Sequence, residues 1–178
     1  MAEYLYSKDI YLRAPEPEDL EIMYQIENDP SSWEVSGFTV PYSRYTLKEY
    51  IRNCRNDIFL DRQLRLMVVH KADDKVIGVV DLADFDPLHN RAAVGIIILK
   101  EFREQGIGKQ ALEAICFYSL KHLHIHQLYA YIPCDNLASL NLFMSIGFSN
   151  QFILKDWIRM SSGYKDAYVV QYINQDSL

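Results

Sequence analysis

The sequence is poor in cysteine, in long apolar runs and in positive charge. Its three cysteines, Cys54, Cys116 and Cys134, are an odd number without Cys-x-x-Cys spacing, which favours buried, reduced thiols in a cytoplasmic protein. No apolar stretch approaches the length of a membrane span, and residues 1–6 lack the basic and apolar pattern of a signal peptide. The formal net charge of −6 argues against general nucleic-acid binding.

Internal repeats, low-complexity tracts and linkers are also absent from the 178 residues. A chain of this length is large enough to bury a proper core as one domain. Hydrophobic residues make up 49% and aromatic residues 13% of the sequence, which is typical of globular rather than disordered proteins. The sequence therefore predicts a single domain, residues 1–178, with its core at about 10–173.

Hydrophobic periodicity and turn residues predict strands interleaved with helices. The predicted strands are 10–13, 63–70, 76–84, 91–99, 128–132, 152–160 and 168–173. The predicted helices are one that carries Leu20, Met23 and Tyr24 and ends before Pro30, one that starts near Ser43, one over 106–123, and one that Asn136 opens and Gly147 ends. Hairpins at both ends of this order predict a mixed sheet.

The most informative stretch is 103–109, Arg-Glu-Gln-Gly-Ile-Gly-Lys, between a predicted strand and a predicted helix. A strand that turns through glycines into a helix presents free N–H groups and a positive dipole end, which together form an anion site. We expect a Cβ at Gly106 or Gly108 to obstruct the close approach of a phosphate. Arg103 and Lys109 add positive charge at the two ends of the turn.

The spacing of this loop excludes two familiar phosphate-binding patterns. A P-loop requires Ser or Thr after its Gly-Lys pair, and the chain has Gln110 there. A dinucleotide fingerprint requires a third glycine where the chain has Ala111. On the loop alone, a pyrophosphate site and an ordinary strand-to-helix turn both stay open.

A second pattern lies about thirty residues downstream, Asn136-x-x-Ser139-x-x-Leu142-Phe143-x-x-x-Gly147-Phe148. Together with Arg103-x-x-Gly106-x-Gly108 it resembles the two signatures of the GNAT superfamily of N-acetyltransferases, and the resemblance extends over about 11–172. Within the superfamily the chain resembles bacterial spermidine and diamine N-acetyltransferases and ribosomal-protein N-terminal acetyltransferases. The resemblance implies an α/β fold of the α+β kind. Its central sheet is mixed and mostly antiparallel, flanked by helices, and a splayed strand pair holds acyl-CoA.

The resemblance also implies that acetyl-CoA is the co-substrate and that no metal takes part. The backbone of Ile96, Ile97 and Ile98 is then expected to bind the pantetheine arm. The pyrophosphate is expected on the loop residues Arg103, Glu104, Gln105, Gly106, Ile107, Gly108 and Lys109. Three further residues are expected at the cofactor, namely Asn136, Ser139 and, by packing, Phe143.

Two other clusters suggest metal binding only at first sight. His122, His124 and His126 straddle a helix end and a strand start, which points their side chains in different directions. The segment Asp84-x-Asp86 begins like a calcium loop, but the glycine and glutamate that should follow are absent. We therefore predict no metal site.

Acetyl transfer to an amine first requires a neutral amine. An ammonium with a lysine-like pKa near 10.4 lies about 3.4 units from neutral pH, so its deprotonation costs about 4.6 kcal/mol. Many relatives carry a glutamate near the start of the strand before the loop, and residues 91–94 offer none. Asp84 and then Asp81 are the candidate bases, because related polyamine enzymes place an acid at Asp84. The alternative is that both are solvated carboxylates at a strand end.

The leaving thiolate is a second departure from the family pattern. Relatives commonly carry a tyrosine, which can protonate the sulfur, where this chain has Phe143. Since a thiol pKa near 8.5 makes thiolate a tolerable leaving group, the loss of this acid is expected to slow the reaction rather than abolish it. Tyr129 and Tyr131 are candidate substitutes.

The acceptor side is predicted from residues 14–43, which contain no Lys, Arg or His. The same stretch carries seven acids: Glu16, Glu18, Asp19, Glu21, Glu27, Asp29 and Glu34. An anionic acceptor face favours a small cationic amine such as a diamine or spermidine, and Trp33 and Glu34 are expected to contact it. Acids are also common at helix N-termini, which is the plainer explanation.

Other functions stay open at this stage. Spermidine acetyltransferases carry acids where this chain has Thr39-Val40 before Pro41-Tyr42, which weakens the polyamine interpretation. The alternatives are a protein N-terminal acetyltransferase and a CoA-binding sensor that has lost catalysis. We expect a small-molecule partner and neither nucleic acid nor membrane. The oligomeric state is open, although relatives often form dimers or larger rings.

Overall fold

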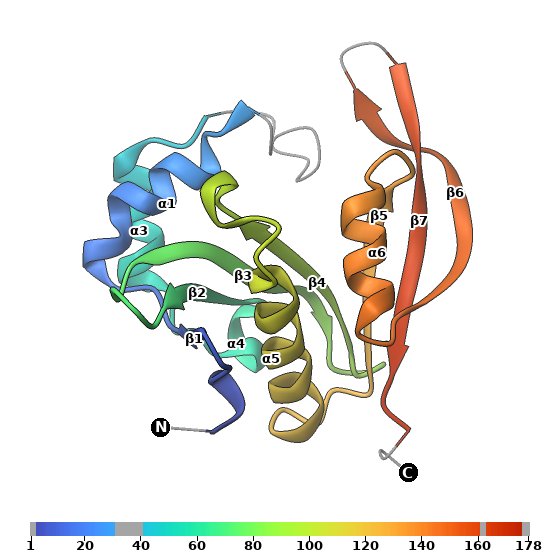
Figure 1. Cartoon of the computed structure of the whole chain (residues 1–178), viewed down its shortest axis with the longest axis horizontal. Helices are drawn as coiled ribbons and strands as arrows, with labels where there is room; N and C mark the ends of the chain where they lie inside the picture. Colours follow the sequence, from blue (N-terminus) through green and yellow to red (C-terminus); the bar gives the residue numbers. More distant parts are fainter. Residues whose placement is uncertain (1–2, 31–40, 161–162, 176–178) are drawn as a thin grey trace.

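The structure is a computed structural model that describes residues 3–30, 41–160 and 163–175 (Figure 1). Seven strands form one sheet in the order β1-β2-β3-β4-β5-β7-β6, in which only β4 and β5 run parallel. The strands are β1 Ile10–Arg13, β2 Leu64–His70, β3 Val76–Asp86, β4 Arg91–Ile98, β5 Gln127–Pro133, β6 Ser149–Met160 and β7 Gly163–Ile173. The predicted mixed, mostly antiparallel sheet is confirmed.

The helices flank this sheet. They are α1 Leu20–Glu27, α3 Arg44–Asn53, α4 Ile58–Asp61, α5 Ile107–Lys121 and α6 Leu137–Ser145, with short 3-10 turns at Glu3–Leu5, Pro17–Asp19 and Lys100–Phe102. Ser43 caps α3 by accepting a hydrogen bond from the Thr46 N–H at 3.0 Å. Gly147 follows α6 with a φ of +101°, a left-handed conformation that favours glycine after a helix.

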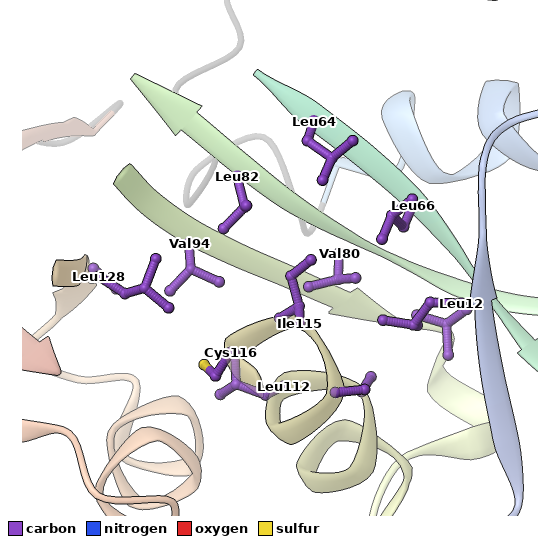
Figure 2. Packing of buried hydrophobic residues seen from close by; sticks show 14 of the residues in the cluster. Leu12, Leu64, Leu66, Val80, Leu82, Val94, Leu112, Ile115, Cys116 and Leu128 are labelled. Atoms are coloured by element: carbon purple, nitrogen blue, oxygen red, sulfur yellow. The ribbon is translucent and has the colours of Figure 1, made fainter. Parts of the chain in front are cut away.

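The sheet separates two hydrophobic clusters. Leu112, Ile115 and Cys116 of α5 face Leu66, Val80 and Val94 of the sheet (Figure 2), and α6 adds residues to the same cluster. On the other face Met23 of α1 and Leu47 of α3 pack against Met67 and Val79. Neighbouring strand residues therefore alternate between the two faces, as the pleat requires.

Cysteine burial agrees with the sequence expectation in part. All three cysteines are free, but only Cys116 is buried, and this burial raises the pKa of its thiol. Cys54 and Cys134 are partly accessible. Within the described ranges, no helix is long and apolar enough to span a membrane.

The parallel pair β4–β5 opens after a few residues. Its register joins Arg91 to Gln127, Ala92 to Leu128 and Ala93 to Tyr129, and pairing stops there. Beyond that point β4 stays paired with β3, and β5 stays paired with β7, so the two strands diverge. This splay, visible between β4 and β5 in Figure 1, lies beside the N-terminus of α5.

Candidate active site

The splay exposes one edge of β4. The Leu99 N–H donates to the Ile77 carbonyl at 2.9 Å, and pairing in an antiparallel ladder alternates along the strand. Gly95 and Ile97 therefore direct their backbone groups to β3, while Val94, Ile96 and Ile98 direct theirs into the splay. We call these last three backbone segments the open edge. The predicted pantetheine contacts of Ile96 and Ile98 fit this register, and that of Ile97 does not.

The loop after β4 is tied to the open edge by Arg103, whose Nε donates to the Ile98 carbonyl at 2.8 Å. Glu104 and Gly106 then adopt left-handed backbone conformations with φ values of +60° and +76°, which turn the chain into α5. The first amide hydrogen bond of the helix runs from the Gln110 N–H to the Gly106 carbonyl at 3.2 Å.

This geometry leaves three amides at the start of α5 without a helical acceptor. In the part of the chain that the structure describes, the N–H groups of Ile107, Gly108 and Lys109 donate to no protein acceptor. We call these three groups the N–H cradle. The Lys109 Nζ lies 3.8 Å from the Glu113 carboxylate, at the same helix end. Free amides, a helix dipole and a nearby cation together suit a pyrophosphate.

The two glycines of the loop have different roles. A Cβ built on Gly106 meets no atom within 4 Å, so its positive φ, rather than space, accounts for glycine there. A Cβ on Gly108 would lie 3.4 Å from Leu142 Cδ2 and 3.8 Å from Ile98 Cγ1. These are ordinary van der Waals separations, so a Cβ at Gly108 would point towards α6 and β4. That this Cβ would obstruct a phosphate stays a prediction.

In the described residues, Asn136 and Phe143 of the downstream sequence pattern cap α6 and anchor it in the core. The Asn136 side chain accepts a hydrogen bond from the Ser139 N–H at 3.1 Å and thereby caps the helix. Phe143 is 2% exposed and packs edge-on against Phe148, with ring centroids 5.0 Å apart. Because Phe143 belongs to the core, almost none of its surface is left for the cofactor packing that we expected.

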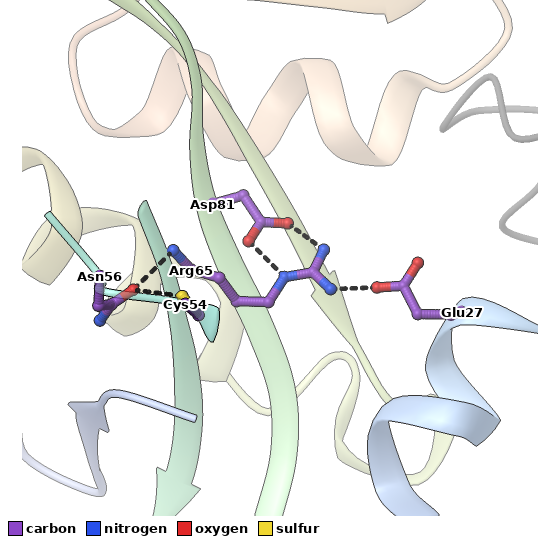
Figure 3. A network of polar contacts seen from close by, with 5 residues as sticks. All are labelled: Glu27, Cys54, Asn56, Arg65 and Asp81. Atoms are coloured by element: carbon purple, nitrogen blue, oxygen red, sulfur yellow. Dashed lines mark hydrogen bonds and ion pairs between the residues drawn. The ribbon is translucent and has the colours of Figure 1, made fainter. Parts of the chain in front are cut away.

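Asp81 takes part in an ion network on the α1 face of the sheet (Figure 3). Both its carboxylate oxygens lie 2.7 Å from Arg65 nitrogens, and a third guanidinium nitrogen of Arg65 pairs with Glu27. Glu27 and Arg65 are mostly buried, with side-chain exposures of 3% and 15%. The role of Asp81 as a base stays a prediction, but its carboxylate is already committed to Arg65.

The network ties α1 to β2 and β3, so its loss is expected to destabilise the fold. Arg65→Met leaves Glu27 buried without its cation, which is expected to cost about 3 kcal/mol of unfolding free energy, measured by urea denaturation. Arg44→Met is the matched control, because it breaks the exposed Arg44–Glu21 pair and is expected to change little. Equal losses in the two variants would contradict a special role for the buried network.

Asp84 has a different environment. It lies at an irregularity between Ala83 and Asp86, where β3 carries one residue more than β4, and its φ is +50°. Its side chain is exposed and has no hydrogen bond or ion pair within the described ranges. Partial burial, and then the nearby Asp84 carboxylate, raise the pKa of the Tyr129 phenol. Asp84 is therefore an accessible carboxylate near the closed end of the splay.

Three aromatic rings extend from this point. The Tyr129 and Tyr131 ring centroids are 5.6 Å apart, and those of Tyr131 and Trp157 are 5.3 Å apart. We call these three side chains the ring row. The i, i+2 spacing of the two tyrosines predicts a shared face of β5, whereas no local pattern in the sequence places Trp157 beside them.

The predicted acceptor-side residues are only partly described by the structure. Trp33 and Glu34 lie outside the described residues. Of the acids in the predicted anionic stretch, three pair with arginines outside it: Asp19 with Arg13, Glu21 with Arg44, and Glu27 with Arg65. The stretch is therefore less anionic than its composition suggested.

No group of three or more His, Cys, Asp or Glu side chains in residues 3–30, 41–160 and 163–175 is arranged to hold a metal.

Comparison with known proteins relates this geometry to an enzyme family. Residues 9–149 match a family model described as an acetyltransferase (GNAT) domain. Spermidine N(1)-acetyltransferase of Vibrio cholerae is 25% identical over 95% of this chain and 98% of its own. Ribosomal-protein-serine acetyltransferase of Escherichia coli K12 is 21% identical over 91% of this chain and 89% of its own.

A solved structure shares the whole fold. Spermidine N-acetyltransferase from Vibrio cholerae, crystallised with CoA and spermine, matches with a TM-score of 0.84 at 23% identity. The match covers 96% of this chain and 99% of that one. At this identity the likeness establishes the architecture, including the mixed sheet and its flanking helices.

Proposed function

Because the chain belongs to the GNAT acetyltransferase family, we propose that it transfers the acetyl group of acetyl-CoA to a primary amine of a diamine or polyamine. The observation that carries this proposal is the open edge of β4 leading directly to the N–H cradle of α5. An extended polar arm that ends in a pyrophosphate matches both parts.

The chain's own residues divide the binding task in this proposal. Acetyl-CoA supplies an activated acetyl thioester. The N–H and carbonyl of Ile96 and the N–H of Ile98 bind amides of the pantetheine arm, as an added strand would, while the Ile98 carbonyl accepts from Arg103. The N–H groups of Ile107, Gly108 and Lys109 hold the pyrophosphate, and the Lys109 side chain adds charge. Asn136 acts here by capping α6, since its carbonyl oxygen already accepts a backbone N–H.

Asp84 is the proposed acceptor of the ammonium proton. Its carboxylate is exposed and lies near the Tyr129 phenol, whereas Asp81 is held by Arg65 and Asp86 accepts hydrogen bonds from the Leu88 and His89 N–H groups. A base of this kind offsets part of the roughly 4.6 kcal/mol that deprotonation of the amine costs near neutral pH. The buried Phe143 offers no proton to the leaving sulfur.

The choice of acceptor rests on charge and on relatives. Exposed carboxylates of Glu16, Glu18 and Asp84 form no salt bridge in the described structure, and the Vibrio cholerae relative and solved structure named above are spermidine acetyltransferases, the latter crystallised with CoA and spermine. Carboxylates attract polycations more strongly than monocations. A peptide N-terminus, the acceptor suggested by the ribosomal-protein relative, carries one charge and a polar backbone.

Release of CoA thiol with an amine panel tests this proposal. Spermidine and propane-1,3-diamine are expected to be better substrates than propylamine or a serine-initiated peptide. Raising the salt from about 50 to 200 mM is expected to raise the diamine KM about twofold or more, with a smaller effect on propylamine. Activity confined to the peptide would show a protein N-terminal acetyltransferase. Acetyl-CoA binding without any thiol release would show a sensor.

A further inference from the structure

Among the described residues, no helix covers the part of the sheet face on which the ring row lies. Tyr129 and Tyr131 alternate along β5 with Leu128, Ala130 and Ile132, which are buried in the cluster under α5 and α6. The two tyrosines therefore face the opposite side, the side that α1 and α3 cover elsewhere. All strand residues in the cluster beneath α1 and α3 belong to β1–β4, so that cluster does not extend to β5. Figure 1 shows the same separation.

The rings are accessible as well as uncovered. Tyr131 is 44% and Trp157 52% exposed, although both belong to residue types with large apolar surfaces. Trp157 comes from β6, in the irregular segment between Leu154 and Ile158, and its ring contacts Tyr131 across β7. Two strands that are not neighbours thus contribute to one aromatic surface.

One end of the ring row lies near Asp84, the candidate base. The register places Ala83 opposite Ala93, and Ala93 opposite Tyr129. Between the β3 end that carries Asp84 and the Tyr129 ring, the intervening strand therefore contributes only a methyl group. Asp84 follows Ala83 directly, and its carboxylate lies near enough to the Tyr129 phenol to help raise the pKa of that phenol, so both lie at the closed end of the splay.

We propose that the ring row binds the second, non-reacting ammonium group of a diamine or polyamine acceptor while the reacting amine lies at Asp84. Electron-rich ring faces attract ammonium groups, and the methylene stem between two amines packs on the same rings. Nitrogens three or four methylenes apart are at most about 5 to 6 Å apart, so a diamine held at Asp84 reaches the first ring, and the third nitrogen of spermidine reaches the rings further along the row. The inference rests on the proposed amine acceptor and assigns its specificity to named residues.

Fluorine NMR of protein labelled with 5-fluorotryptophan tests the inference without acetyl transfer. The chain has two tryptophans, Trp33 and Trp157, and the loss of one resonance in Trp157→Phe assigns the other. Spermidine is expected to shift the Trp157 resonance in a saturable manner, and propylamine is expected to shift it far less. Tyr131→Leu keeps an apolar side chain but removes the ring, so the spermidine dissociation constant is expected to rise roughly 3- to 30-fold.

Tyr164→Leu is the matched control, because Tyr164 is 63% exposed on the same hairpin and makes no ring contact in the described residues. It is expected to leave spermidine binding unchanged. A Trp157 resonance that does not respond to spermidine, or equal losses of affinity in the Tyr131 and Tyr164 variants, would overturn the inference. A resonance that follows protein concentration instead would assign the row to contact with a second copy and would also overturn it.

The two proposals fail separately. If spermidine is acetylated while Trp157 does not respond, the proposed function is supported and the role of the ring row is rejected. If spermidine shifts Trp157 but only peptides are acetylated, the row binds amines and the proposed acceptor is rejected. As a kinetic measure independent of labelling, Tyr131→Leu is expected to raise the spermidine KM and to leave the propylamine KM within about twofold.

Discussion

Acetyl-CoA is expected to raise the melting temperature of the wild-type protein and of Gly106→Asn, but not that of Gly106→Asp. A ligand that binds only the folded state at 100 times its dissociation constant adds about 2.7 kcal/mol of stability. For a chain of this size that corresponds to a rise of about 5 to 10 °C. The measurement is a thermal melt with and without acetyl-CoA.

The pair of variants isolates charge from backbone strain. Gly106 has a φ of +76°, which asparagine and aspartate tolerate better than other residues, and the space around its Cβ position is open within 4 Å. Both variants therefore carry a similar conformational cost. Only aspartate places a negative charge beside the N–H cradle, where repulsion from a phosphate at about 4 Å amounts to about 4 kcal/mol near a protein surface. That is enough to weaken binding at least 100-fold.

The same melts distinguish two roles for the loop. A shift retained in Gly106→Asp would remove the pyrophosphate from this helix end and leave the glycines as an ordinary strand-to-helix turn. A shift lost in both variants would indicate that the left-handed backbone at Gly106, rather than the local potential, controls binding. Gly108 is unsuitable for this test, because a side chain there contacts Leu142.

The sequence predicted the order of elements because periodicity is a local property. Strand β1 has the predicted bounds, and α3 and α6 begin at the predicted caps Ser43 and Asn136. Helix α4 was missed since four residues are too few to show a period of 3.6. The splay was expected from resemblance alone, because no local pattern states where β4 and β5 stop pairing.

Site chemistry was less predictable because it depends on contacts between distant residues. Asp81 and Asp84 are both carboxylates of one predicted strand, but Arg65 of the neighbouring strand pairs with Asp81. The sequence placed Glu27 on a predicted anionic face, but in the structure Glu27 pairs with Arg65, which is 38 residues away. Trp157 joins Tyr131 only through strand order and a local irregularity in β6. Pairings of this kind have no signature in a single sequence.

Asp84→Asn is expected to lower kcat/KM for a diamine about 100- to 1,000-fold near neutral pH while acetyl-CoA binding persists. The substitution preserves shape, and asparagine adopts the left-handed φ of +50° as readily as aspartate does. The lost function is therefore acceptance of the ammonium proton. Since the free amine needs no base, the deficit is expected to shrink as the pH rises towards the amine pKa near 10.

Asp86→Asn is the matched control for this experiment. Asp86 is two residues away in the same strand, but its carboxylate accepts hydrogen bonds from the Leu88 and His89 N–H groups at 3.0 and 3.1 Å and pairs with Arg91. Its loss is expected to affect stability more than turnover. A deficit in Asp84→Asn that stays constant across pH would make Asp84 a positioning residue for the amine. Unchanged turnover would remove it from the site and return the choice of base to Asp81, at the cost of its pairing with Arg65.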